Sequence, residues 1–219
     1  MNTAIVIGAT GVTGRGIVNH LLRCNEYRKV KVFARRPMEQ QDARIELHLV
    51  DFDQIDEWKH LLNGDDLFSA LGTTRKQAGS LDEQYRVDYT LQAEIIEAAA
   101  QNGVARLFLV SSPHADSKSP FFYLRMKGEL EIFATYQGFK VMVFFKPSII
   151  TGDRDEERPG ERLGALFSKG LSAILPAAKG LRPISGDLLG QAMVEAAVRN
   201  LPLGLHIYEP RDIFKLLES

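Results

Sequence analysis

The sequence contains almost no cysteine and no long hydrophobic run. Cys24 is the single cysteine among 219 residues, so an intrachain disulfide is impossible and a structural zinc site lacks its usual thiolate ligands. No apolar run approaches the ~20 residues of a membrane-spanning helix. The apolar start is too short for a signal peptide and continues directly into the fold. We therefore expect a cytoplasmic protein that does not cross a membrane.

An excess of charge of one sign is also missing. Lys and Arg number 27, Asp and Glu number 28, and the net charge is −1. This balance gives no electrostatic reason to expect nucleic acid or an anionic membrane as a partner. Four scattered histidines, His20, His48, His60 and His206, have no carboxylate or cysteine at ligand spacing, so we expect no metal site.

A glycine-rich turn lies close to the start of the sequence, between a strand pattern and a helix pattern. Residues 3–7 are apolar and mostly β-branched, which is typical of a buried parallel strand. Gly8, Gly11 and Gly14 follow with the spacing GxxGxxG, and Ile17 belongs to an amphipathic helix pattern. Such glycines let backbone N–H groups approach a pyrophosphate, and the helix N-terminus supplies partial positive charge. We predict a dinucleotide-binding turn; the alternative is a glycine-rich turn that binds nothing.

Two arginines follow the second predicted strand, 30–34. An NAD site usually has Asp or Glu here, roughly 20 residues past the glycines, to bind the ribose 2′-hydroxyl. This sequence has Arg35 and Arg36 instead. A guanidinium binds a phosphate through two hydrogen bonds, whereas a carboxylate would repel the 2′-phosphate of NADP. We therefore predict NADP(H) as the cofactor; the alternative is a solvated pair of surface arginines.

Strand and helix patterns alternate along the chain, which favours a parallel sheet with helices on both faces. The expected strands cover 3–7, 30–34, 45–50, 66–71, 106–110, 141–145 and 205–208. After the first helix, the expected helices cover 55–62, 81–101, 121–136, 163–175, 186–200 and 211–217. We predict an α/β fold with a single domain over 1–219, a Rossmann-type doubly wound parallel sheet with a small C-terminal lobe from about residue 151.

Two polar segments are expected to be irregular. Segment 75–80 follows the fourth strand as a polar loop. Segment 151–162 is dense in charge, Gly and Pro. It is either a solvated connector or a loop that closes over the cofactor.

A serine pair, a tyrosine and a lysine follow the fifth predicted strand. Ser111 and Ser112 end that strand, and Tyr123 and Lys127 stand four residues apart on one face of the next helix. An ammonium near a phenol favours the phenolate, so we expect a lowered pKa for Tyr123. Such a tyrosine can exchange a proton with a carbonyl or alcohol oxygen while a hydride moves to or from a nicotinamide, and Ser112 can hydrogen-bond the same oxygen. The alternative is a helical Tyr–Lys pair without a role.

These motifs resemble the short-chain dehydrogenases/reductases, and in detail they are similar to the atypical members of the Tat-interactive protein family. The marks of that family are Gly-Ala-Thr-Gly-Val-Thr-Gly-Arg at 8–15, Arg35-Arg36, Val50-Asp51-Phe52, Leu71-Gly72-Thr-Thr-Arg75, Val87-Asp88, Ser111-Ser112, Phe122-Tyr123-Leu124, Lys127-Gly128-Glu129 and Arg158-Pro159-Gly160-Glu161. The family often has Arg-Pro-Gly where this sequence has Lys146-Pro147-Ser148. The resemblance implies NADPH bound by the first loop and by Arg35, Arg36, Leu71, Gly72, Tyr123, Lys127, Ile150 and Arg158.

The complete expected site has a cofactor-binding part and a catalytic part. We expect the cofactor to be bound by Gly8, Thr10, Gly11, Val12, Thr13, Gly14, Arg35, Arg36, Asp51, Phe52, Leu71, Gly72, Thr73, Ser111, Tyr123, Lys127, Pro147, Ile150 and Arg158. The expected catalytic residues are Tyr123, Lys127 and Ser112. His114 follows the serine pair and is either a solvated surface residue or a contact for the substrate.

Two functions remain open at this point. One is an NADPH-dependent reductase of an unidentified small carbonyl compound, with Tyr123 as proton donor, Lys127 orienting the ribose and Ser112 positioning the carbonyl. The other is a non-catalytic NADPH-binding regulator that acts through a protein partner. A homodimer is also open.

Overall fold

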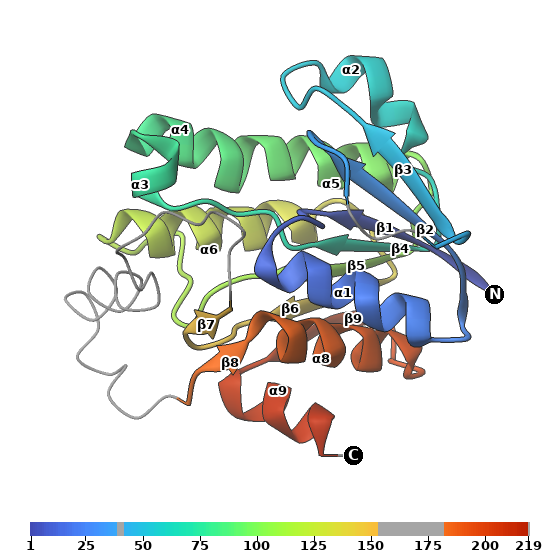
Figure 1. Ribbon diagram of the computed structural model, residues 1–219. Coiled ribbons are helices and arrows are strands. Elements are labelled where there is room, and N and C mark those ends of the chain that lie inside the picture. Colours follow the sequence, from blue (N-terminus) through green and yellow to red (C-terminus); the bar gives the residue numbers. More distant parts are fainter. Residues whose placement is uncertain (39–41, 153–181, 219) are drawn as a thin grey trace, which may run out of the picture.

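Seven parallel strands form the central sheet in the part of the chain that the computed structural model describes, residues 1–38, 42–152 and 182–218. The strands are β1 (Asn2–Ile7), β2 (Tyr27–Ala34), β3 (Ile45–Leu49), β4 (Asp66–Ser69), β5 (Arg106–Val110), β6 (Val141–Phe145) and β9 (Gly204–Tyr208). Their order is β3-β2-β1-β4-β5-β6-β9, and in Figure 1 their carboxyl ends point to the left. The order reverses between β1 and β4, which is where doubly wound sheets bind their ligands.

Helices cover both faces of this sheet (Figure 1). On one face α1 (Val12–Arg23) and α8 (Gly186–Val198) pack against strand residues such as Val6. On the other face α5 (Leu91–Gln101) and α6 (Phe122–Thr135) pack against residues such as Ile5. Because successive side chains of a strand point to opposite faces, an unbroken apolar strand supplies both layers. The predicted doubly wound architecture is therefore observed.

Shorter elements connect these layers. They are α2 (Ile55–Trp58), the 3₁₀ turn η1 (Lys59–Leu61), α3 (Arg75–Ala78), α4 (Leu81–Tyr85), the π-turn η2 (Arg86–Thr90), β7 (Ile150–Thr151), β8 (Ile184–Ser185) and α9 (Pro210–Leu217). Strands β7 and β8 pair with each other in a separate two-stranded sheet. The predicted helix 163–175 and nearly all of segment 151–162 lie outside the described residues.

The predicted single helix over 81–101 differs from the structure. It consists of α4, then η2, then α5, so one π-turn interrupts the regular hydrogen bonding. A π-turn holds more residues than an α-helical turn and changes which side chains face inward. One consequence is that Asp88 is buried, at 2% exposure. The polar loop expected over 75–80 also contains a helical turn, α3, whose first turn is capped where Thr74 Oγ accepts a 3.2 Å hydrogen bond from the N–H of Gln77.

The first long helix, α1, and helix α8 touch backbone to backbone. A Cβ added to Gly190 would lie 2.4 Å from the backbone nitrogen of Ile17, and one added to Gly16 would lie 2.8 Å from Cα of Asp187. A side chain at either position would force the two helices apart. The glycines therefore allow α8 to cover α1 closely.

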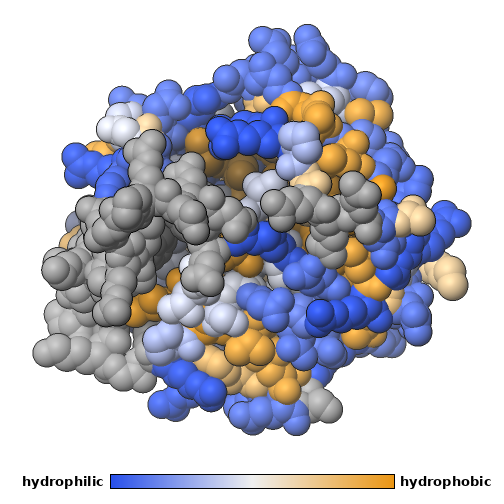
Figure 2. Space-filling model, viewed as in Figure 1, coloured by the Kyte–Doolittle hydropathy of each residue, from blue (hydrophilic) through white to orange (hydrophobic). Residues whose placement is uncertain are grey.

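The surface mixes polar and apolar groups. Over the described residues on the face shown in Figure 2, hydrophilic and hydrophobic side chains are interspersed. None of the described helices combines the length and the apolar character that crossing a bilayer requires.

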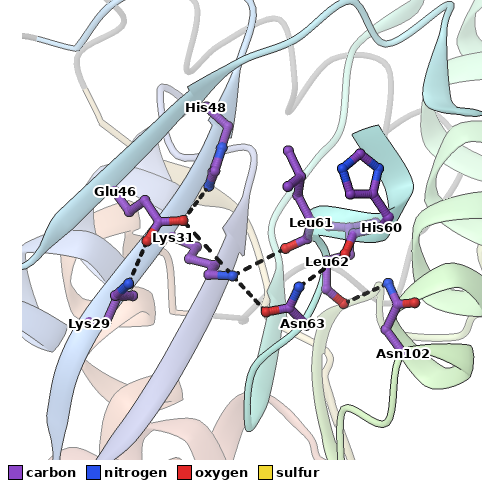
Figure 3. A network of polar contacts seen from close by, with 9 residues as sticks. All are labelled: Lys29, Lys31, Glu46, His48, His60, Leu61, Leu62, Asn63 and Asn102. Atoms are coloured by element: carbon purple, nitrogen blue, oxygen red, sulfur yellow. Dashed lines mark hydrogen bonds and ion pairs between the residues drawn. The ribbon is translucent and has the colours of Figure 1, made fainter. Parts of the chain in front are cut away.

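A polar network joins strands β2 and β3 to the segment that precedes β4 (Figure 3). Lys31 of β2 is only 8% exposed, and its ammonium donates to Asn63 Oδ1 at 2.8 Å and to the carbonyl oxygen of Leu61 at 3.3 Å. Asn102, at the end of α5, donates to the carbonyl oxygens of Lys59 and Leu62 at 2.7 and 3.1 Å. The network adds hydrogen bonds to carbonyl groups in and just after η1 and gives the buried Lys31 ammonium its acceptors.

Candidate functional site

The turn between β1 and α1 is shaped by an unusually close approach of β4. Gly8 has φ +80°, and a Cβ there would lie 2.6 Å from the carbonyl oxygen of Ala70, just past the end of β4. Only glycine fits this combination of left-handed backbone and missing space. The first glycine therefore fixes the path of the turn.

The other two glycines of the motif, Gly11 and Gly14, have different structural roles. Gly14 packs against the turn itself, because a Cβ there would lie 2.0 Å from the carbonyl oxygen of Gly8. Gly11 is exposed, and its Cβ would meet only that same oxygen, at 3.2 Å. Gly11 thus keeps the outer side of the turn free of side-chain atoms, as an approaching pyrophosphate requires.

The start of α1 suits an anion. Gly11 is its N-cap residue, no side chain caps the helix, and no acidic residue lies in its first turn. Thr10 is exposed beside Gly11, while Val12 is half-buried and Thr13 is buried. The N–H groups of this first turn and the helix dipole together fit the pyrophosphate of a dinucleotide.

The arginine pair lies beside this turn. Ile7 of β1 is paired with Phe33 of β2, so Arg35 and Arg36 follow β2 on the same edge of the sheet as Gly8. Both arginines are exposed. Their guanidinium groups are thus available to a phosphate at the adenosine end of a bound dinucleotide.

The other expected cofactor contacts follow β3, β4 and β6. Phe52 packs edge-on against Trp58 with ring centroids 5.5 Å apart, and the Asp51 carboxylate accepts a 2.9 Å bond from the N–H of Asp53. Leu71 and Thr73 are half-buried after β4, and Gly72 between them is exposed. Pro147 is buried after β6, and Ile150 lies in β7. Arg158 lies outside the described residues.

The three expected catalytic residues come together at the ends of β5 and α6. The Ser112 hydroxyl lies beside the Tyr123 phenol, whose pKa it lowers, and it donates a 3.2 Å hydrogen bond to the carbonyl oxygen of Pro113. Lys127 is one helical turn farther along α6, and its ammonium lies 3.5 Å from the carbonyl oxygen of Val110. Ser112 and Lys127 are buried and Tyr123 is half-buried.

A fourth charged residue, Asp88, stands next to this group. Its Oδ1 lies 3.8 Å from the ammonium nitrogen of Lys127, and the two side chains are 2% and 5% exposed. Its Oδ2 accepts a 3.0 Å hydrogen bond from the N–H of Thr73. The side chain of Gln92 donates a 2.8 Å bond to the carbonyl oxygen of Asp88, which supports the π-turn. The sequence patterns assigned no role to Asp88; a carboxylate between Val87 and Tyr89 in an apolar helix pattern was the available signal.

The expected lowering of the Tyr123 pKa is wrong. Burial, followed by the negative charge of Asp88, raises the pKa of the phenol, and the hydrogen bond with Ser112 offsets only part of this. Burial also raises the pKa of Asp88 and lowers that of Lys127, while the attraction between the two opposes both changes. The sequence pattern indicated that Lys127 lies near the phenol, but it did not indicate that the Asp88 carboxylate neutralises the charge of Lys127.

A second ion pair lies farther along α6. Glu131 accepts hydrogen bonds from the hydroxyl of Ser111 and, at 3.0 Å, from the ammonium of Lys146. Lys146 directly follows β6, where the family that the sequence resembles often has arginine. Ser111 is therefore tied to the framework rather than to Tyr123.

Two further sequence expectations concern His114 and the lack of a metal site. His114 is exposed and has φ +59°, an uncommon backbone conformation for a residue other than glycine. Within the described ranges, no three His, Cys, Asp or Glu side chains are grouped as metal ligands would be.

Comparison with known proteins identifies relatives of this chain. Residues 8–139 match the family described as NAD(P)H-binding. Protein fmp52 of Emericella nidulans is 32% identical over 208 residues, which cover 92% of this chain and 89% of that protein. Protein HTATIP2 of Rattus norvegicus is 35% identical over 169 residues, covering 75% of this chain and 69% of that protein. The resemblance to the atypical short-chain dehydrogenases/reductases of the Tat-interactive type is confirmed.

Solved structures share the fold. MoeE5, solved with UDP-glucuronic acid and NAD, has a TM-score of 0.68 at 17% identity over 94% of this chain and 75% of that one. The UDP-glucose 4-epimerase of Thermus thermophilus, solved with NAD, has a TM-score of 0.66 at 16% identity over 99% of this chain and 82% of that one. The Rossmann-type fold predicted from the sequence is confirmed.

The names of the fungal relatives contradict the expected cytoplasmic location. The Emericella protein is named as mitochondrial, and so is protein FMP52 of Saccharomyces cerevisiae, which is 31% identical over 210 residues, 89% of this chain and 87% of that protein. Our expectation depended on a start too short for a signal peptide and on the lack of a long apolar run. Neither feature distinguishes the cytosol from the interior of a mitochondrion.

Proposed function

This chain belongs to the NAD(P)H-binding family, and we propose that it is an NADP(H)-dependent reductase of a small carbonyl compound. The observation that carries the proposal is the grouping of Ser112, Tyr123 and Lys127 at the carboxyl edge of the sheet. This edge is shared with the glycine turn after β1, where a dinucleotide fits. The proposed proton donor and the proposed nucleotide site therefore lie on the same edge of the sheet.

The chemistry follows from these groups. NADPH, when bound, supplies the hydride that reduces the carbonyl carbon. Tyr123 gives its phenolic proton to the carbonyl oxygen as the C=O double bond becomes a single bond, and Ser112 donates a hydrogen bond to the same oxygen. Once the alcohol has left, the Tyr123 phenolate takes a proton from water, which restores the phenol. Because the pKa of Tyr123 is raised, the phenol carries its proton at neutral pH before each turnover.

The preference for NADP(H) over NAD(H) is supported by the edge next to the glycine turn. Two exposed arginines follow β2, where an NAD-binding protein usually has a carboxylate for the ribose. Asp51, after the neighbouring strand β3, already accepts a bond from the N–H of Asp53. Arg35 and Arg36 are therefore the groups available to a 2′-phosphate.

The experiment is a turnover screen with paired tyrosine variants. Aldehydes, ketones and quinones are tested for NADPH oxidation, and the best substrate is then used with Tyr123→Phe and Tyr136→Phe. Tyr136 ends the same helix and is 82% exposed, so its variant controls for loss of a phenol. We expect Tyr123→Phe to bind NADPH normally and to lose about 10²–10⁴-fold in turnover, and Tyr136→Phe to match the wild type.

Two results would overturn the proposal. Wild-type turnover in Tyr123→Phe would remove the assigned proton donor. Tight NADPH binding without reduction of any carbonyl compound would instead favour a non-catalytic, NADPH-binding regulator.

A further inference from the structure

The Lys127 ammonium lies between two oxygen-bearing groups. It lies 3.8 Å from Asp88 Oδ1 and 3.5 Å from the carbonyl oxygen of Val110. The Asp88 carboxylate is itself held, because its other oxygen accepts the N–H of Thr73 at 3.0 Å. A Cβ on Gly72 would lie 3.1 Å from Asp88 Oδ1, so the backbone after β4 closes on the carboxylate from this side as well. The Asp88–Lys127 ion pair is thus held in place by the surrounding backbone.

The π-turn explains how a carboxylate reaches this position. Asp88 lies in the middle of η2, and its backbone carbonyl accepts the side-chain amide of Gln92. The oxygen of that same amide accepts a 2.9 Å bond from the hydroxyl of Ser69 at the end of β4. Two consecutive hydrogen bonds therefore connect the strand end to the turn that carries Asp88. Such turns are frequent at functional sites.

Among the residues that the structure describes, the charges around Tyr123 and Lys127 sum to zero. Asp88 faces both residues from η2, and Glu131 faces Lys127 from its own helix. Glu131 is in turn paired with Lys146 after β6, at 3.0 Å. Two carboxylates and two ammonium groups thus share this buried region, and neither ammonium acts as an isolated positive charge. Removing one partner of such a pair would leave the other charge buried alone, which is strongly destabilising.

We propose that Asp88 is a positioning residue that binds the Lys127 ammonium and so leaves Tyr123 as a neutral phenol, which sets the site for reduction of a carbonyl rather than oxidation of an alcohol. This inference rests on the proposed function and specifies which of the two reactions, carbonyl reduction or alcohol oxidation, the protonation state of Tyr123 favours. An isolated ammonium beside a phenol favours the phenolate, which is the base that removes a proton from an alcohol. A neutralised ammonium keeps the phenol, which is the acid that reduction consumes. Burial acts on the phenol in the same direction.

The test is a titration of Tyr123 that needs neither substrate nor turnover. The ultraviolet absorbance of tyrosinate is followed against pH for the full chain without added nucleotide. The same titration of Tyr123→Phe is subtracted, so that only this phenol among the six tyrosines remains. We expect the wild-type midpoint to lie above that of free tyrosine, about 10. A midpoint below about 9 would overturn the proposal, whatever happens in any variant.

The decisive variant is Asp88→Asn, titrated in the same way against Asp88→Asn/Tyr123→Phe. Asparagine keeps an oxygen that can accept the N–H of Thr73 but removes the charge. We expect the midpoint of Tyr123 to fall by about 1–3 pH units, because Lys127 then acts on the phenol without a counter-charge. Asp82→Asn, which removes an exposed charge from the neighbouring helix α4, should leave the midpoint unchanged. An unchanged or higher midpoint in Asp88→Asn would overturn the proposal.

The outcome is separable from that of the proposed function. A lowered midpoint in Asp88→Asn together with no turnover of any carbonyl compound would keep the electrostatic role of Asp88 and remove the reductase. Turnover that depends on Tyr123, together with an unchanged midpoint in Asp88→Asn, would keep the reductase and remove the role of Asp88.

Discussion

The guanidinium of Arg106 forms a two-pronged ion pair with the carboxylate of Asp66, at the amino ends of the neighbouring strands β5 and β4. The bond from Nη2 to Oδ2 is 2.6 Å long, Nε donates to Oδ1, and Nη1 donates to the carbonyl oxygen of Ala197 at 2.8 Å. Asp66 is fully buried. The pair therefore joins β4 and β5 to the end of α8, at the edge of the sheet opposite the candidate site.

Arg106→Met should strongly destabilise the fold. The substitution leaves the Asp66 carboxylate buried without its cation, which typically costs about 3–5 kcal/mol of unfolding free energy. Urea denaturation measures this loss. The control is Lys59→Ala, which breaks the exposed ion pair with Asp56 and should have no measurable effect. A loss below about 1 kcal/mol in Arg106→Met would show that the pair matters no more than an exposed one.

Tyr27 should make the protein sensitive to alkali. Burial, followed by the charge of Asp66, raises the pKa of this phenol, which donates a hydrogen bond to Asp66. The stabilisation is complete below the pKa of an unfolded tyrosine, near 10, and it is lost as the pH rises above that value, because the unfolded chain then releases a proton that the folded chain retains. For one tyrosine the slope is about 1.4 kcal/mol per pH unit.

Denaturation midpoints between pH 7 and 11 test this dependence. Tyr27→Phe should be less stable than the wild type at pH 7, because Asp66 loses a hydrogen bond, but its stability should fall less steeply above pH 10. Tyr85, whose pKa burial and then Glu129 raise to about 12, adds to the slope in both proteins. Tyr136→Phe, an exposed control, should keep the wild-type slope. Equal slopes in Tyr27→Phe and the wild type would contradict the prediction.

Gly11 and Gly14 should separate nucleotide binding from folding. Gly11→Val should fold but fail to bind NADPH, because its side chain would occupy the outer side of the turn, and φ −77° with ψ 168° suits any residue. Gly14→Ala should lose about 1–3 kcal/mol of stability or more, because its Cβ would overlap the carbonyl oxygen of Gly8 at 2.0 Å. Thermal unfolding and NADPH titration measure the two effects. Normal binding in Gly11→Val would show that the pyrophosphate lies elsewhere.

Arg35 should decide between the two cofactors. Arg35→Ala should weaken NADPH binding by about 10–100-fold, the equivalent of a charge-assisted hydrogen bond of about 1.5–3 kcal/mol, and leave NADH binding nearly unchanged. Fluorescence titration with both nucleotides gives the affinities. Arg28→Ala is the matched control, since Arg28 is an exposed arginine near the opposite end of the same strand. Equal affinity of the wild type for NADH and NADPH would rule out the preference.

The fold could be predicted where the chain carries continuous apolar strands. The predicted and the observed bounds of β6, 141–145, agree at both ends, because every residue of that strand is apolar and buried. The short strands β7 and β8 could not be predicted, since Ile150 pairs with Ile184 across a long stretch of chain. A strand of two residues is too short to show the alternation or the apolar run by which a strand is recognised in a sequence.

The candidate site could be predicted only as far as local spacing reaches. Tyr123 and Lys127 share a helical face, and four residues of sequence suffice to see this. The contact of Lys127 with Asp88 joins segments 39 positions apart and requires a π-turn, which the apolar period does not indicate. The direction of the Tyr123 pKa depends on that contact, and for this reason the sequence-based expectation was wrong.

The glycine contact between α1 and α8 also has a consequence for the order of folding. The apolar side of α1 is covered by a helix that begins at Gly186, so the first helix stays uncovered until a segment far along the chain has been synthesised. Pairings this distant in sequence slow folding and leave apolar surface uncovered on the nascent chain. The glycine turn at the start of α1 therefore reaches its final packing only after α8 has been synthesised, and a chain interrupted before α8 would expose that surface to chaperones or proteases.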